Sequence, residues 1–194
     1  MNNNVRKTRY SIFFVVQAAL IAALYVVLTL LSNAVGLASN VIQVRISEAL
    51  CVLALFTPGA VPGLWIGCML ANLITGAVWQ DIIFGALATL IGAGVTYLLR
   101  KLPFWFAPIP TIAANMIIVP LVLKLAYGLE DAVWFMVLTV GAGELIAAGI
   151  LGVGLYFALR PAAPKLFGPL YCGPVRESRK EARQPDQDPT AKPE

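Results

Sequence analysis

Apolar stretches of membrane-spanning length follow one another through most of this chain, and they restrict its fold more than any motif does. A spanning α-helix needs about 20 consecutive, mainly apolar residues. Between Ser11 and Leu159 the chain carries nine charged residues, four basic and five acidic. Charged residues make up 12% of the whole chain and hydrophobic residues 59%, whereas about a quarter of an ordinary soluble domain is charged. The sequence therefore predicts an all-α integral membrane protein embedded in a lipid bilayer.

Six transmembrane helices are expected. Five apolar stretches lie near residues 11–32, 60–78, 82–99, 108–126 and 132–159, and a shorter one lies near 45–58. Six spans place both termini on one side of the membrane. All basic residues except Arg45 and Lys124 then fall on that side, as the positive-inside rule requires of cytoplasmic segments. Both termini are therefore expected to be cytoplasmic.

The composition changes at about Pro161, which divides the chain into two parts. Residues 1–160 form the expected six-helix membrane domain, whereas residues 161–194 are rich in proline and charge, as in "RESRKEARQPDQDPTAKPE". Such a segment cannot bury enough apolar surface to fold, so a disordered cytoplasmic tail is expected. No internal repeat is evident, which argues against a transporter built from two inverted halves.

Several kinds of chemistry are excluded by composition. The chain contains no histidine, so histidine acid–base catalysis and histidine metal sites are impossible. Its three cysteines lack the spacing of a metal or redox motif and predict no disulfide framework. The net charge of +4 comes from the two ends of the chain, so it does not indicate nucleic-acid binding. No P-loop is present, and no metal or cofactor is predicted.

Charged residues near lipid are costly and usually have a purpose. Arg45 and Glu48, in "VRISEAL", stand at the start of the short apolar segment. At positions i and i+3 they can neutralise each other, or they can anchor the helix, since the positive end of its dipole favours Glu48. Glu144 lies about 20 Å below the outer surface at roughly 1.5 Å of rise per residue. A carboxylate at that depth should face a cavity or a partner rather than lipid.

Uncharged polar residues extend this set of candidates. Asn72 and Trp79 are seven residues apart and are expected on one helical face, where an amide and a ring can line a cavity. Asn115 holds the middle of the fifth span, and Lys124 lies nearly opposite it on an ideal helix. The structural alternative is an interhelical hydrogen bond for each polar residue and an interfacial aromatic belt for the tryptophan.

The first apolar stretch contains "QAALIAALY", in which Ala18 pairs with Ala22 and Ala19 with Ala23. Small residues four positions apart let another helix approach closely. The pattern is compatible both with packing inside this chain and with docking to a partner.

Residues 43–101 closely resemble the core of the QueT family, which are substrate-binding (S) components of energy-coupling factor transporters associated with queuosine salvage. The most specific matching parts are "RISEAL", "PGLWIGCMLAN", "FGALATL" and the "GAGE" of the last helix. The resemblance runs from the first helix to about Leu159 and leaves the tail outside. It implies six helices, cytoplasmic termini, a ligand pocket open to the outside, and a place in a prokaryotic cell membrane.

The resemblance also implies partners. S components use small residues of the first helix to meet the transmembrane coupling subunit, and Ala18, Ala19, Ala22 and Ala23 match that pattern. Two ATPase subunits would be separate chains, which accounts for the missing P-loop.

The implied ligand is queuosine or a precursor of it. A deazaguanine base presents N1–H and an amino group side by side to one carboxylate, and the amine of several precursors invites a second carboxylate. The candidate carboxylates are Glu48, Glu144 and Asp81. For the other ligand contacts, Trp79 or Trp134 can stack on the ring, Asn72 and Asn115 can meet its remaining edge, and Arg45 can hold Glu48 ionised or bond the base carbonyl.

The expected function is therefore non-enzymatic uptake of a queuosine-related base or nucleoside. An S component for another vitamin-like heterocycle is the alternative within transport. An intramembrane enzyme would also bury carboxylates, but a membrane aspartyl protease needs two aspartates at membrane depth, and Asp81 and Asp131 both fall at expected loops. A structural membrane protein without a ligand would leave Glu144 unexplained. Genes neighbouring this one would separate these alternatives.

Overall fold

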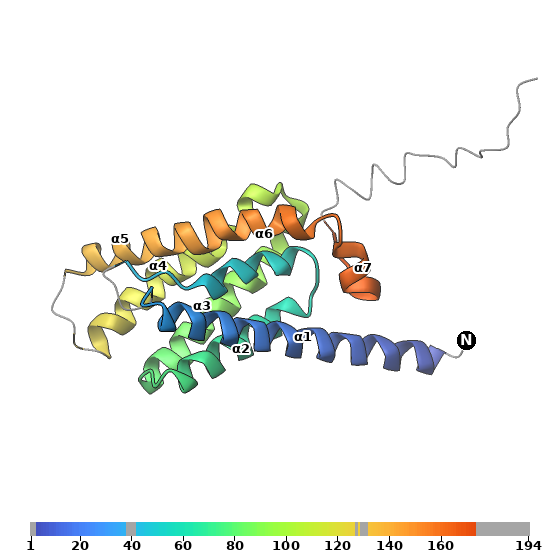
Figure 1. The fold of residues 1–194 in the computed structure, drawn as a ribbon, viewed down its shortest axis with the longest axis horizontal. Helices are drawn as coiled ribbons and strands as arrows, with labels where there is room; N and C mark the ends of the chain where they lie inside the picture. Colours follow the sequence, from blue (N-terminus) through green and yellow to red (C-terminus); the bar gives the residue numbers. More distant parts are fainter. Residues whose placement is uncertain (1–2, 38–41, 127, 129–131, 174–194) are drawn as a thin grey trace, which may run out of the picture.

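The computed structural model describes residues 3–37, 42–126, 128 and 132–173, and all regular elements in these ranges are helices. The chain runs back and forth along the long axis of the molecule (Figure 1). The main elements are α1 (Asn3–Ala34), the 3-10 helix η1 (Ile46–Leu55), α2 (Ala60–Ile74), α3 (Trp79–Leu98), α4 (Pro108–Leu125), α5 (Val133–Glu144), the π-helix η4 (Leu145–Leu151) and α6 (Gly152–Leu159). Shorter pieces are η2 (Leu99–Lys101), η3 (Phe104–Phe106), α7 (Ala163–Phe167) and η5 (Gly168–Leu170).

Four helical segments in the described part of the chain are long and apolar enough to cross a membrane. They are Lys7–Ala34, Trp79–Lys101, Phe104–Leu125 and Val133–Leu159, the last comprising α5, η4 and α6. Two further helices, Ile46–Leu55 and Ala60–Ile74, are apolar but shorter. The expectation of six full spans is thus confirmed for four segments.

The expected span at 60–78 is shorter because the chain turns before its end. Helix α2 stops at Ile74, and Gly76 takes a φ of +74°, a left-handed conformation that glycine adopts without steric cost. Helix α3 then begins at Trp79, three residues earlier than expected. Asn72 and Trp79 consequently lie on two different helices, so the expectation that they share one helical face is wrong.

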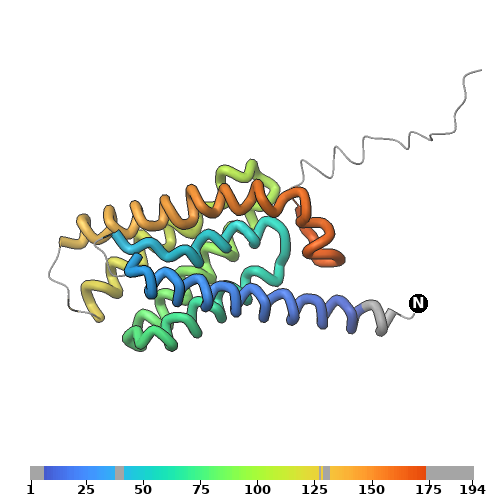
Figure 2. The backbone as a smooth tube through the Cα atoms, in the orientation of Figure 1, coloured from blue at the N-terminus to red at the C-terminus, as the bar shows by residue number. Residues whose placement is uncertain are grey.

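The centre of the bundle is the 3-10 helix η1. All its residues from Ser47 to Leu55 are buried, and it contacts α1, α3, α6 and η4. Figure 2 shows it running between α1 and the long helix formed by α5, η4 and α6. Its sequence, "ISEALCVLAL", is apolar nearly all round, which suits a helix enclosed on every side. A 3-10 helix rises about 2.0 Å per residue, so these ten residues extend over roughly 20 Å.

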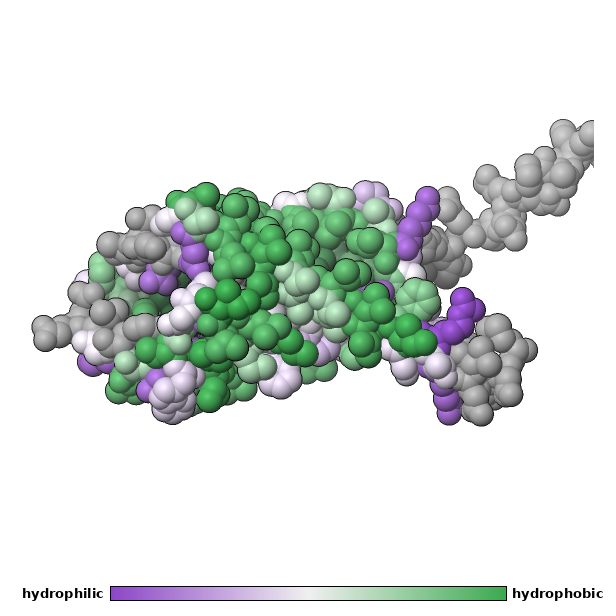
Figure 3. Space-filling view, turned by 60° about the horizontal axis from the view of Figure 1, so that its bottom comes forward, coloured by the Kyte–Doolittle hydropathy of each residue, from purple (hydrophilic) through white to green (hydrophobic). Residues whose placement is uncertain are grey.

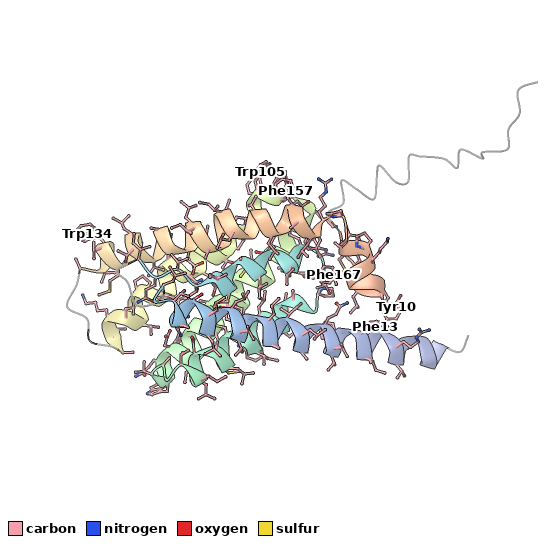
Figure 4. All side chains as sticks on the ribbon, in the orientation of Figure 1. Tyr10, Phe13, Trp105, Trp134, Phe157 and Phe167 are labelled. Carbon is pink, nitrogen blue, oxygen red and sulfur yellow. The ribbon has the colours of Figure 1, made fainter. Side chains whose placement is uncertain are left out.

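Side-chain distribution agrees with a protein that lies in a bilayer. Hydrophobic residues cover the middle of the molecule, and hydrophilic ones gather towards its two ends (Figure 3). Two of the exposed tryptophans are Trp134, at one end of the molecule, and Trp105, beside Phe157 of α6 (Figure 4). Tryptophan is enriched at the two membrane–water interfaces, so these positions indicate where the apolar band stops.

The fold continues past the expected domain boundary at residue 160. Helix α7 packs against the bundle, and its Phe167 ring stacks on the Phe56 ring with centroids 5.8 Å apart. Gln17 on α1 donates a hydrogen bond to the Phe167 carbonyl at 2.9 Å, and the Cys172 amide donates to the Phe56 carbonyl at 2.7 Å. The expectation of an unfolded tail from residue 161 is therefore wrong up to residue 173, because this part carries apolar side chains that pack. Residues 174–194, the rest of that predicted tail, lie outside the described residues.

Candidate functional site

Three polar residues of α1 attach the beginning of η1 to that helix. The Ile46 amide donates to Ser32 Oγ at 2.9 Å, and Thr29 Oγ1 donates to Ser47 Oγ at 2.8 Å. One turn earlier in α1, the Tyr25 hydroxyl donates to Glu48 Oε1. Positions 25, 29 and 32 recur with the helical period and therefore face the same neighbour. This polar stripe holds the segment that carries Glu48 against α1.

Glu48 is buried, with 2% of its surface exposed. Its two carboxylate oxygens each accept one hydrogen bond, Oε1 from the Tyr25 hydroxyl and Oε2 from Cys51 Sγ at 3.3 Å. Both donors are neutral groups, so they orient the carboxylate without neutralising its charge. A buried charge of this kind requires a compensating partner.

Arg45 does not pair with Glu48, as the i, i+3 spacing suggested. Its Nη2 lies 3.8 Å from Asp81 Oδ2, and its Nη1 donates to Asn72 Oδ1 at 3.3 Å. Asn72 Nδ2 in turn donates to the Asp81 carbonyl at 3.2 Å. The reason is that Arg45 precedes η1 and has an extended backbone, with φ −97° and ψ 103°, so the helical spacing rule does not apply to it.

Glu144 ends α5, just before the π-helix η4, and is 8% exposed. Asn115 Nδ2 on α4 donates to its Oε1 at 2.8 Å, while Oε2 has no hydrogen-bond partner among the described residues. The neighbouring Gly143 lies directly against the Gln43 carbonyl, where any Cβ would overlap with that backbone. Residue 143 must therefore be glycine for the segment before η1 to lie this close to α5.

Several of these residues line a small cavity of about 30 Å³. Its lining consists of Gln43, Arg45, Glu48, Cys68, Gly85, Thr89, Asn115, Val119, Val140 and Glu144. A water molecule needs at least about 10–15 Å³ of such volume, so the cavity has room for about two waters. Arg45 is the one basic residue among the lining residues, while Glu48 and Glu144 are both acidic. No group of described residues could hold a metal ion through three or more histidine, cysteine or acidic side chains.

Four of the seven predicted ligand-binding residues line the cavity, namely Arg45, Glu48, Asn115 and Glu144. Asn72 and Asp81 are buried beside it and contact Arg45. Trp79 does not join them, because its side chain is 63% exposed at the start of α3. Trp134, the alternative stacking residue, is 67% exposed. Neither tryptophan is among the residues that line the cavity.

Sequence reasoning missed Tyr25, Cys51 and Cys68. The two cysteines belong to no motif in the sequence, yet Cys51 donates a hydrogen bond to Glu48 and Cys68 lines the cavity. The signal for Tyr25 was present in the sequence, because Tyr25, Thr29 and Ser32 form a polar stripe in an apolar helix. No sequence signal distinguishes the two cysteines from ordinary small apolar residues.

The alanine pairs of α1 occupy two different environments. Ala18 and Ala22 face α2, where a Cβ on Gly63 would lie 2.7 Å from the Ala18 carbonyl oxygen and one on Gly67 would lie 2.9 Å from that of Ala22. These two alanines therefore take part in packing within the chain. Ala19 and Ala23 are exposed on the surface of α1.

Comparison with known proteins relates the whole membrane region to one family. A family described as QueT transporter matches residues 15–161. The queuosine precursor transporter QueT of Lactococcus lactis subsp. cremoris (strain MG1363) is 38% identical over 77 residues, which are 40% of this chain and 45% of that relative. The chain thus aligns with less than half the length of this relative. No solved structure shows significant similarity to it.

Proposed function

This chain belongs to the QueT transporter family, and on that premise we propose that it is the substrate-binding S component of an energy-coupling factor transporter that imports queuosine or a queuosine precursor. The observation that carries the proposal is the unpartnered oxygen of Glu144, which is buried at the wall of the small cavity that Arg45 and Glu48 also line. A buried carboxylate oxygen without a donor is costly, and a ligand that brings a donor removes that cost.

The chemistry of the cavity suits a deazaguanine. The base offers two adjacent donors, N1–H and the amino group, and two carboxylates line the cavity to accept them. Asn115 and Arg45 supply amide and guanidinium groups beside those carboxylates. A bicyclic base is larger than the cavity of about 30 Å³, so binding requires the surrounding side chains to move apart.

Six membrane crossings with both termini in the cytoplasm remain part of the proposal. Helices η1 and α2 are short, but at about 2.0 and 1.5 Å of rise per residue they each extend over roughly 20 Å, and η1 is shielded from lipid by its neighbours. The end of the bundle where α1 begins and α3 ends carries Lys7, Arg9, Arg100, Lys101, Arg160 and Lys165. The positive-inside rule assigns this end to the cytoplasm, and the cavity then lies towards the outside of a bacterial cell membrane.

Partners follow from the surface of α1. The exposed pair Ala19 and Ala23 leaves room for a helix of the transmembrane coupling subunit to approach closely. Two ATPase subunits on separate chains would supply the energy. An S component for another small heterocycle is the remaining candidate within transport, since the same cavity would serve any ligand with several donors.

Ligand binding by the purified protein tests the proposal. Mass spectrometry of retained small molecules should find a deazaguanine, and calorimetric titration with 7-aminomethyl-7-deazaguanine should show saturable binding. Adenine is a negative control, because it lacks the N1–H and 2-amino donors and the aminomethyl group, and should not bind. Retention of an unrelated heterocycle, or equal binding of adenine, would refute the assignment of the ligand.

A further inference from the structure

The charges at the cavity do not balance within the described residues. Arg45 lies 3.8 Å from Asp81 and also lines the cavity with Glu48 and Glu144, so one guanidinium is shared among three carboxyl groups. Lys124 is exposed on α4 rather than turned into the bundle, and the other described lysines and arginines are at the opposite end of the molecule. Two buried carboxylates of this kind favour a positively charged occupant.

Glu48 and Glu144 differ in what the protein offers them. Glu48 accepts two hydrogen bonds, from Tyr25 and Cys51, and its position is fixed by both. Glu144 accepts one, from Asn115, and its second oxygen is buried without a donor. Glu144 therefore retains the stronger unmet demand for both a donor and a positive charge.

We propose that the cavity selects deazaguanines that carry a protonated amine over those that are uncharged, and that Glu144 is the residue that binds the ammonium group. This inference rests on the proposed function, because it specifies which queuosine precursors the same cavity accepts. Glu48, with its neighbours, is then left to accept the donors of the base edge.

The two classes of precursor make opposite demands on Glu144. An ammonium group supplies a positive charge and up to three donors, and it forms a charge-assisted hydrogen bond with a carboxylate. A nitrile at the same ring position is neutral and ends in an acceptor, so it leaves Glu144 Oε2 without a donor and faces it with a second electron-rich atom. Sites built around a buried hydrogen-bonding group discriminate strongly against a ligand that lacks its partner.

The test is a comparison of 7-aminomethyl-7-deazaguanine with 7-cyano-7-deazaguanine, which share the ring and its donor edge. In calorimetric titrations of the purified chain we expect the aminomethyl compound to bind at least about thirtyfold more tightly, as a lost buried charge-assisted contact implies. Equal affinities would overturn the inference and leave the proposed function intact. Failure of both compounds to bind would overturn the proposed function itself.

Three variants assign the selectivity to a residue. Glu144→Gln should abolish the preference by weakening the aminomethyl compound selectively, whereas Glu144→Asp keeps the charge and should retain the preference. Glu48→Gln is the matched control, since it removes a carboxylate from the same cavity and should weaken both compounds by a similar factor. If Glu144→Gln weakens both compounds equally, or if Glu48→Gln alone abolishes the preference, Glu144 does not bind the amine. Thermal unfolding of each variant verifies that it is folded.

Discussion

Replacing Gly67 with alanine tests whether α1 and α2 pack as closely as the structure indicates. An added Cβ would lie 2.8 Å from Tyr25 Cβ, 2.9 Å from the Ala22 carbonyl oxygen and 3.0 Å from Ala22 Cα. Two of these three atoms belong to the backbone of α1, which cannot move aside as a flexible side chain can. The third belongs to Tyr25, whose hydroxyl holds Glu48. The two helices must therefore separate by a few tenths of an ångström.

The cost can be isolated with a matched substitution in another helix. Gly94 lies inside α3, and a Cβ there would meet no atom within 4 Å. Alanine has a higher helix propensity than glycine by about 1 kcal/mol, and this gain is common to both variants. Overpacking a close contact costs about 1–3 kcal/mol. Gly67→Ala should therefore be less stable than Gly94→Ala by about 1–3 kcal/mol.

Thermal unfolding of the purified variants in one detergent measures this difference. For a chain of this size 1 kcal/mol shifts the midpoint by about 2–4 °C, so Gly67→Ala should unfold roughly 2–12 °C below Gly94→Ala. Gly67→Ala should also weaken ligand binding, because it displaces Tyr25 and with it Glu48. Equal midpoints for the two variants would show that α1 and α2 are not in contact at Gly67, and the separate roles assigned to the two alanine pairs would then be unfounded.

Three further substitutions have defined outcomes. Tyr25→Phe leaves Glu48 Oε1 without its donor and should destabilise the protein by about 1–3 kcal/mol in thermal unfolding. In a Glu48→Gln background the same change should cost clearly less, and additivity of the two changes would contradict the contact. Replacing Ala19 and Ala23 with leucine should preserve ligand binding and stability but abolish uptake by cells that express the whole transporter, and normal uptake would exclude this face as the docking surface. Gln17→Ala removes the bonds to the Phe167 carbonyl and to Thr57 and should lower stability by about 1–3 kcal/mol; an unchanged midpoint would mean that Gln17 does not hold α7 in place.

The membrane class and the order of the helices could be predicted because they depend on properties spread over many residues. The length of the apolar stretches and the uneven distribution of basic residues between the two sides do not depend on how the side chains pack. The ends of the elements could not be predicted with the same accuracy. The turn at Gly76 and the packing of α7 on Phe56 each depend on a few contacts between distant residues, and these contacts leave no periodic signal in the sequence.

The pairing of Arg45 shows a second limit. The spacing of Arg45 and Glu48 assumes that both residues belong to one regular helix, yet η1 begins at Ile46 and Arg45 is extended. Because η1 starts one residue after Arg45, the guanidinium points to Asp81 rather than to Glu48. Asp81 belongs to α3, which begins more than thirty positions later in the chain. Helix boundaries commonly vary by one or two residues, so pairings at a helix end are poorly determined by spacing alone.

The two cavity carboxylates could be identified from the sequence, but the difference between them could not. Both are acidic residues in or beside apolar segments, and the sequence distinguished Glu144 only by its depth in the membrane. In the folded chain their donors differ, because Glu48 meets a tyrosine of α1 and a cysteine of its own helix while Glu144 meets one asparagine of α4. A carboxylate whose two oxygens each already accept a hydrogen bond gains less from a donor on the ligand, although it can still accept one, whereas a carboxylate with an unpaired oxygen gains more from a ligand that donates to it. We therefore expect Glu144 rather than Glu48 to determine ligand selectivity, because the protein supplies fewer hydrogen-bond donors to Glu144, and not because Glu144 lies deeper in the membrane.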